Sequence, residues 1–216
     1  MAITPDTLLD YGNLAGVIAC AMTAALAAGK CKLDWVGVAV LGSTTALGGG
    51  SARDVLLGHH PLAWVAQPGW LLLATFAALA TIPLARLVRR LPTTFLVLDA
   101  IGLVAFTVIG CSVARALGHG IVIAMVSGLI TGCVGGVLRD VLSGTVPLLF
   151  RREVYATVSL ATGGLYMGGL ALGWPHDAVM LGAMAIGLAL RIVAVHQRWN
   201  VPTFEIADES PASRQD

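Results

Sequence analysis

Seven long apolar stretches dominate this chain of 216 residues and limit what it can fold into. A helix that crosses a bilayer needs about 20 mostly apolar residues, and each stretch approaches or exceeds that length. Glycine or proline separates consecutive stretches, and none shows the alternating polarity of a barrel strand. We therefore predict an all-α membrane protein with seven transmembrane helices. The predicted spans are Leu8 to Ala28, Trp35 to Leu57, Trp70 to Leu87, Thr94 to Ala114, Ile121 to Leu142, Val154 to Trp174 and Ala178 to Val195.

The composition agrees with a surface that faces lipid and argues against several functions. Only 12% of the residues are charged, whereas soluble domains carry about 25%. The net charge of +1 and the aromatic content of 6% argue against a nucleic-acid partner. The Lys-Ser/Thr that completes a phosphate loop does not follow Gly48 to Ser51. His59 and His60 lie beyond the end of the span that holds Ser51, so nothing supports a serine hydrolase and we do not expect an enzyme. No CxxC pair is present, and we expect no cofactor.

Basic residues are distributed unequally between the two sets of loops. Ten fall on one side of the predicted bundle, whereas only Arg115 falls on the other. Because basic residues are retained on the cytoplasmic side, we predict a multi-pass protein with its N-terminus outside and its C-terminus in the cytoplasm. That orientation requires an odd number of spans, in agreement with seven. The ten residues are Lys30, Lys32, Arg86, Arg89, Arg90, Arg151, Arg152, Arg191, Arg198 and Arg214.

The chain contains an internal repeat at a fixed offset of 86 residues. The segment from Gly49 to Gly58 aligns without a gap with the segment from Gly135 to Gly144, and both contain Gly-Gly-x-x-Arg-Asp. Each unit holds three spans, so we predict that the second is inverted relative to the first, as in many transport proteins. We predict one transmembrane domain over residues 1–200 and a polar cytoplasmic tail over residues 200–216. The domain comprises a first repeat at about residues 8–90, a second at about 94–175 and a seventh helix at about 178–195.

The glycines of the repeated motif have two interpretations. Close helix packing through small residues is one, and GxxxG spacing elsewhere in the chain suggests it. Three consecutive glycines, Gly48 to Gly50, instead favour a kinked or broken helix, because glycine weakens helices. Carbonyl groups freed at such a break would face a water-filled path, where they can coordinate a cation near Gly48, Gly49 and Gly50. Ser51 and Thr131 add hydroxyl groups to the same two spans, although most such groups bond the preceding helical turn.

Each motif also places an arginine and an aspartate within a predicted span, where each charge costs about 2.5–3.5 kcal/mol. Snorkelling to the interface is one explanation, because Arg53-Asp54 and Arg139-Asp140 lie in the last third of their spans. Geometry argues against pairing across the repeats, because inversion places the two Arg-Asp pairs on opposite sides of the midplane. We also expect adjacent arginine and aspartate side chains on one helix to point apart.

Partners for the arginines are predicted from the preceding span of each repeat. Asp99 lies near the same end as Arg139, so we predict that the two form an ion pair near the inner mouth. The residue at the matching offset is Asn13, so we predict that Arg53 meets Asn13 or Asp10 near the outer mouth.

The two motifs resemble the signatures of the bacterial branch of the trimeric intracellular cation (TRIC) channel family. The first is Gly-Gly-Gly-Ser-Ala-Arg-Asp-Val-Leu-Leu-Gly from Gly48, followed by Pro61 and Trp64. The second is Gly-Gly-Val-Leu-Arg-Asp-Val-Leu-Ser-Gly from Gly135, followed by Pro147 and Arg-Glu-Val-Tyr-Ala from Arg152. The resemblance covers roughly residues 8 to 195.

The resemblance implies a homotrimer among the lipids of a bacterial inner membrane, with one path for potassium and sodium in each protomer. It implies that the kinked second and fifth helices form this path. The second repeat has Val134 where the first has Gly48. The implied pore residues are Gly48, Gly49, Gly50, Arg53, Asp54, Gly135, Gly136, Arg139 and Asp140, to which we add Ser51 and the supporting polar residues Asn13, Asp99 and Thr131.

Two transport modes fit this pattern. Some bacterial relatives of this family are described as glycine transporters, and inverted repeats also suit a carrier that alternates access between its two sides. Four charges inside the spans favour a cation channel, and the small-solute carrier is kept as the alternative.

Overall fold

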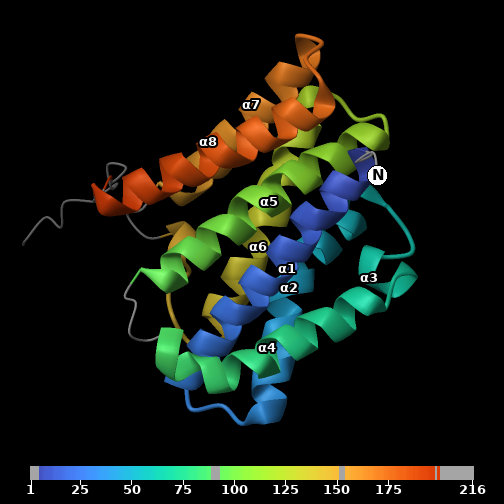
Figure 1. The fold of residues 1–216 in the computed structure, drawn as a ribbon. Coiled ribbons are helices and arrows are strands. Elements are labelled where there is room, and N and C mark those ends of the chain that lie inside the picture. Colours follow the sequence, from blue (N-terminus) through green and yellow to red (C-terminus); the bar gives the residue numbers. More distant parts are fainter. Residues whose placement is uncertain (1–4, 89–92, 151–153, 198, 200–216) are drawn as a thin grey trace, which may run out of the picture.

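The structure, a computed structural model, describes residues 5–88, 93–150, 154–197 and 199 (Figure 1). These residues form eight α-helices and one short 3-10 helix, η1. The predicted tail beyond residue 200 lies outside the described residues, as do six of the ten basic residues used for the orientation: Arg89, Arg90, Arg151, Arg152, Arg198 and Arg214.

Each predicted apolar stretch forms one long helix, and α3 is an additional helix of four residues in a loop. Four helices, α1, α5, α6 and α8, are long and apolar enough to cross a membrane by length and composition. The helix α7 has 17 residues, and α2 carries the glycine-rich and charged motif. The helices are α1 (Pro5–Lys30), α2 (Trp35–Leu57), α3 (Ala63–Ala66), α4 (Gly69–Val88), α5 (Thr94–Ala116), α6 (Ile121–Leu142), η1 (Leu148–Phe150), α7 (Tyr155–Ala171) and α8 (His176–His196).

Helices α1, α2, α5 and α6 form the centre of the bundle (Figure 1). Helix α4 packs against α1 and α2, whereas α7 and α8 pack together on the side of α5 and α6. Helices α1 and α5 lie side by side and run in opposite directions (Figure 1). The core on the α4 side consists largely of buried alanines, which let neighbouring helices approach closely.

Helix boundaries recur at the offset of the sequence repeat. Helices α1 and α5 end at equivalent residues, and two further pairs begin at equivalent residues. The matching boundaries are Lys30 and Ala116, Trp35 and Ile121, and Gly69 and Tyr155.

Helices α2 and α6 are continuous through their glycine motifs, so a break in either helix, one of the two predicted forms, is wrong. The other form, a kink, stays a prediction. The glycines serve close packing instead. A Cβ atom on Gly49 would collide with the carbonyl oxygen of Thr131, and one on Gly135 would collide with that of Thr45. Both the glycines and the threonines are related by the offset, so this contact is reciprocal and α2 and α6 cross antiparallel. The cost of Gly48 and Gly49 in α2 is offset by the close approach of α6.

Candidate functional site

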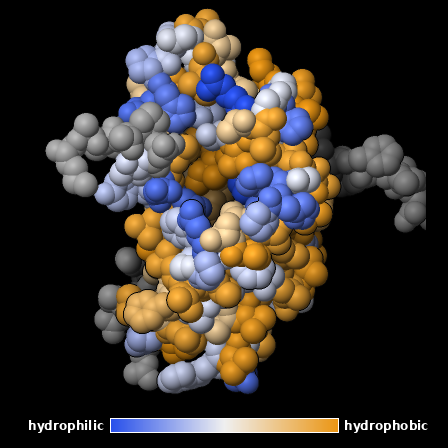
Figure 2. Space-filling model, turned by 90° about the vertical axis from the view of Figure 1, so that its right-hand side faces the viewer, coloured by the Kyte–Doolittle hydropathy of each residue, from blue (hydrophilic) through white to orange (hydrophobic). Residues whose placement is uncertain are grey.

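A cavity of about 420 Å³ lies at one end of the crossing between α2 and α6. Its walls come mainly from α1, α2, α5 and the segment that connects α2 to α4, with Thr131 of α6 and Trp70 of α4. Figure 2 shows a hollow on the face that carries the start of α1, with hydrophilic residues at its rim and apolar surface at its depth. Five of the predicted site residues, together with Asp10, line this cavity. They are Asn13, Gly50, Ser51, Arg53 and Thr131.

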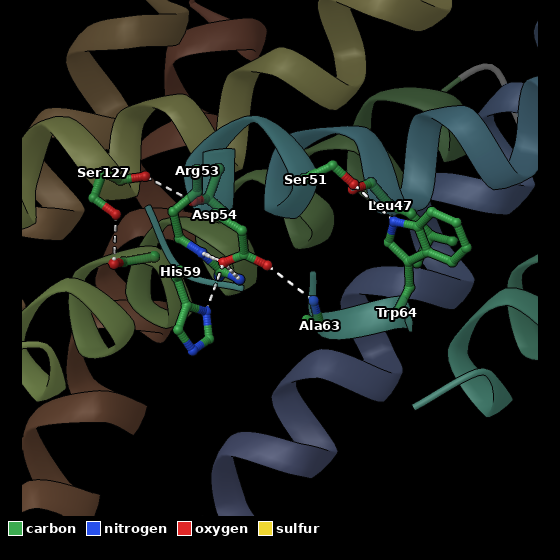
Figure 3. Close-up of polar contacts among 10 residues, drawn as sticks. Leu47, Ser51, Arg53, Asp54, His59, Ala63, Trp64 and Ser127 are labelled. Carbon is green, nitrogen blue, oxygen red and sulfur yellow. Dashed lines mark hydrogen bonds and ion pairs between the residues drawn. The ribbon is translucent and has the colours of Figure 1, made fainter. Parts of the chain in front are cut away.

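Asp54 anchors Arg53 at the edge of this cavity (Figure 3). The guanidinium donates through Nε and Nη2 to Oδ1 of Asp54, at 2.9 and 2.7 Å. The expectation that adjacent arginine and aspartate point apart is therefore wrong, because the flexible arginine stem folds back along the helix end. The predicted contact of Arg53 with Asn13 or Asp10 is also not formed: all three line the cavity, and Arg53 binds its own neighbour.

The same aspartate fastens the segment that follows α2. Oδ2 of Asp54 accepts from the backbone N–H of Ala63 at 3.0 Å, and His59 Nδ1 lies 3.2 Å from Oδ1. A second bond joins this segment to α2, because Trp64 Nε1 donates to Ser51 Oγ at 3.1 Å (Figure 3). Helix α3 is thereby held along the rim of the cavity.

The other end of the crossing is filled by a group that we name the Arg139 cluster. Arg139 Nη1 donates to Asp99 at 2.7 Å and to Thr23 at 3.1 Å, so the predicted ion pair between Arg139 and Asp99 is confirmed. Both charged side chains are buried, at 1% and 3% exposure. The cluster comprises Thr23, Phe95, Asp99, Arg139, Asp140 and Tyr155.

Aromatic rings complete the cluster. The guanidinium of Arg139 lies 4.9 Å from the ring centroid of Phe95, and Lys30 Nζ lies 5.4 Å from the same centroid. The hydroxyl of Tyr155 fills the space beside Gly136, and the ring of Tyr155 lies 4.7 Å from the guanidinium carbon of Arg191 in α8. These contacts join α1, α5, α6, α7 and α8 at one place.

The two ends keep some features in common. Arg139 Nε donates to Asp140 at 2.8 Å, as Arg53 Nε does to Asp54. Asp140 Oδ2 accepts from the backbone N–H of Leu148 at 2.9 Å, as Asp54 does from Ala63. The repeated Arg-Asp motif therefore anchors the loop after each of α2 and α6.

The remaining predicted residues have structural roles. Ser51 and Thr131 donate to the carbonyl groups of Leu47 and Ser127 one turn earlier, as the sequence predicted for most hydroxyl groups in these spans. Of the three consecutive glycines, only Gly50 lines the cavity. The predicted cation position near Gly48, Gly49 and Gly50 stays a prediction. Within the described part of the chain, no group of three or more His, Cys, Asp or Glu side chains is placed to hold a metal ion.

Sequence reasoning missed Thr23, Phe95, Tyr155 and Trp64 as members of the site. Phe95 and Tyr155 are ordinary apolar or interfacial residues when read singly. A signal was available in the repeat: Tyr155 stands where the first repeat has Gly69, and such unequal positions are where the two halves must differ.

Comparison with known proteins agrees with this architecture. A family model described as "Glycine transporter" matches two segments of the chain, residues 11–86 and 96–170. The inner membrane protein YadS of Escherichia coli (strain K12) is 38% identical over 201 residues, which cover 92% of this chain and 97% of YadS. The membrane protein YvgT of Bacillus subtilis (strain 168) is 33% identical, covering 88% of this chain and 93% of YvgT.

Solved structures are similar as well. A TRIC trimeric intracellular cation channel orthologue from Rhodobacter sphaeroides has a TM-score of 0.86 and 32% identity, covering 89% of this chain and 99% of its own. A chain from a study of conductance through TRIC cation channels has a TM-score of 0.83 and 36% identity, covering 91% and 97%. A TRIC channel from C. elegans, at 14% identity and a TM-score of 0.59, shares the fold alone.

The fold and the site define an all-helical membrane protein with a polar-rimmed cavity at one end of a helix crossing and a buried arginine cluster at the other. The chain belongs to the family described as glycine transporter. It also belongs to the bacterial branch of the TRIC channel family.

Proposed function

We propose that this protein is a channel for monovalent cations, with one path in each protomer that follows the crossing of α2 and α6. The observation that carries the proposal is the placement of a cavity with charged and polar groups in its wall and of a buried polar cluster along this crossing. The cavity lies at the Arg53 end, and the Arg139 cluster lies at the other end. The reciprocal contact of Gly49 and Gly135 lies between them, and at 1.5 Å per residue the two arginines are separated by about 18 Å along the helices. In this conformation an ion that enters the cavity is stopped at the Arg139 cluster, so the path is closed at that end.

The charges of the cavity favour cations. Asp10 is exposed and lines the cavity, whereas the charge of Arg53 is countered by the buried Asp54. Asn13 and Ser51 supply uncharged oxygens on the same walls. When Arg53 and Asp54 are counted as a neutral pair, Asp10 leaves one net negative charge at the cavity, and a negatively charged cleft concentrates cations near its mouth. Potassium and sodium are the permeant ions that we propose.

The membrane arrangement belongs to the same proposal. We infer seven spans in two inverted three-helix units plus α8, with the N-terminus outside and the C-terminus in the cytoplasm. The opposite directions of α1 and α5 and the reciprocal glycine contact support inversion (Figure 1). Location in a bacterial inner membrane is supported by the name of the YadS relative, and a homotrimer by the name of the Rhodobacter sphaeroides channel.

The direct test is recording from purified protein in a planar bilayer under a potassium chloride gradient. We expect unitary currents whose reversal potential lies near the potassium equilibrium potential. Asp10→Asn is expected to lower the potassium conductance, most strongly at low salt, because the Debye length is about 10 Å at 0.1 M salt. Asp10→Glu keeps the charge and is the matched control. Absence of unitary currents from protein that is folded and inserted would contradict the channel.

A carrier for a small zwitterion is the second candidate. Arg53 and Asp10 offer a guanidinium and a carboxylate in one cavity, and these groups suit the two ends of glycine. The family description supports the same reading. Saturable uptake of glycine into proteoliposomes, together with a lack of unitary potassium currents, would favour the carrier over the channel.

A further inference from the structure

The residues around Arg139 differ in a systematic way from those at the equivalent positions around Arg53. Four side chains that contact or surround Arg139 supply a carboxylate, a hydroxyl and two aromatic rings. At the offset of 86, each is replaced by a residue that lacks the corresponding group. The pairs are Asp99 and Asn13, Thr23 and Ile109, Phe95 and Leu9, and Tyr155 and Gly69.

The residues that lack these groups lie at or near the cavity beside Arg53. Leu9, Asn13 and Ile109 all line the cavity, and a Cβ atom on Gly69 would meet no other atom within 4 Å. In the Arg139 cluster the equivalent positions touch: Asp99 and Thr23 lie 2.7 and 3.1 Å from the guanidinium. The cavity and the cluster are thus equivalent regions of two similar units, one empty and one filled.

Position 99 carries the largest difference in interaction energy. Its carboxylate forms a charge-assisted hydrogen bond with Arg139, and such bonds are about twice as strong as neutral ones. The amide of Asn13 has no negative charge to attract Arg53. Arg53 instead donates hydrogen bonds to Asp54 through both Nε and Nη2. Arg139 uses only Nε for Asp140 and so keeps Nη1 for α1 and α5.

We infer that positions 13 and 99 determine which end of the path is closed. An acidic residue draws the arginine of the facing helix across the path and closes that end, whereas an amide leaves it open. The inference rests on the proposed function, because it takes these two ends to belong to one path. Asn13 and Asp99 are therefore positioning residues that act through Arg53 and Arg139.

Two cysteine positions related by the offset can report on the two ends. Cys133 of α6 is 2% exposed, and its equivalent in α2 is Leu47, which lines the cavity. Two reference proteins are needed, each with a single cysteine. One carries Leu47→Cys with all native cysteines replaced by alanine, and the other keeps Cys133 with the remaining native cysteines replaced by alanine. The measurement is the rate of modification by a charged methanethiosulfonate reagent in detergent, where the reagent reaches both ends.

Opposite changes are expected at the two reporters. Asn13→Asp is expected to slow modification of the cysteine at position 47 by about tenfold or more, the effect of one added hydrogen bond to a charged group. Asp99→Asn is expected to speed modification of Cys133 by about the same factor, because it removes one such bond. The matched control Asn13→Gln adds no charge and is expected to leave position 47 reactive.

Either of two results would overturn the inference: unchanged reactivity at position 47 in Asn13→Asp, or equal slowing in Asn13→Gln. If Asp99→Asn does not fold, as judged by size-exclusion chromatography, the Asn13→Asp measurement decides alone, because it adds one charge to a partly exposed wall. The rate at which the reagent modifies either cysteine does not depend on whether ions flow through the protein. A protein that shows both shifts but passes no current would retain this inference and lose the proposed channel.

Discussion

The Arg53 end and the Arg139 end of the bundle use the same motif to opposite effect. In both, the arginine binds the aspartate next to it, and that aspartate holds the following loop through a backbone N–H. At the Arg139 end the guanidinium also binds Asp99 and Thr23, and the space is filled. At the Arg53 end it borders a cavity of about 420 Å³. The motif therefore fixes the loops, and the neighbouring helices decide whether the end is open.

The largest effect is expected from removing the aspartate of each motif. Asp54→Asn leaves Arg53 buried without an anion, and breaking a buried pair in this way costs about 3–5 kcal/mol of unfolding free energy. Asp140→Asn should cost clearly less, because Arg139 keeps Asp99 at 2.7 Å. Thermal unfolding of the two variants in the same detergent measures the difference. Equal losses would show that Asp99 contributes nothing to holding Arg139.

A smaller and symmetric effect is expected where the two repeats meet. Gly49→Ala and Gly135→Ala each place a methyl group against a backbone carbonyl, which cannot move aside as a side chain can. Overpacking of this kind costs about 1–3 kcal/mol. Gly50→Ala is the matched control, since its Cβ would find only Arg53 Nη2, at 3.7 Å. Unfolding temperatures that fall for one glycine alone would contradict the reciprocal contact.

The sequence was sufficient for the helices and for one ion pair. The apolar stretches predicted all seven long helices, because a hydrophobic run of bilayer length has few other stable forms. The pair of Arg139 and Asp99 followed from placing both residues near the same end of adjacent helices. Such predictions need only the order and direction of helices, which the repeat supplies.

Contacts that depend on side-chain conformation were not predictable in this way. The spacing of Gly48 to Gly50 is the same for a broken helix and for a tightly packed one, and only the position of Thr131 on α6 decides between them. Arg53 could reach either Asn13 or Asp54 by rotating its stem, and the shorter path to Asp54 prevails. The cavity arises from what is missing at positions such as Gly69, and a missing side chain gives no pattern of its own.

The smallest effect is expected at a contact that only the open end possesses. Trp64 Nε1 donates to Ser51 Oγ at 3.1 Å, whereas the equivalent residues of the second repeat are Val137 and Phe150, which cannot form this bond. Ser51→Ala should therefore lower the unfolding free energy by only about 0.5–1.5 kcal/mol. Hydrogen exchange should become faster over residues 59–67 and stay unchanged over residues 145–150, where Asp140 still holds the loop through Leu148. Faster exchange in both loops would mean that Ser51 supports the whole crossing of α2 and α6, and the rim of the cavity would lose its separate role.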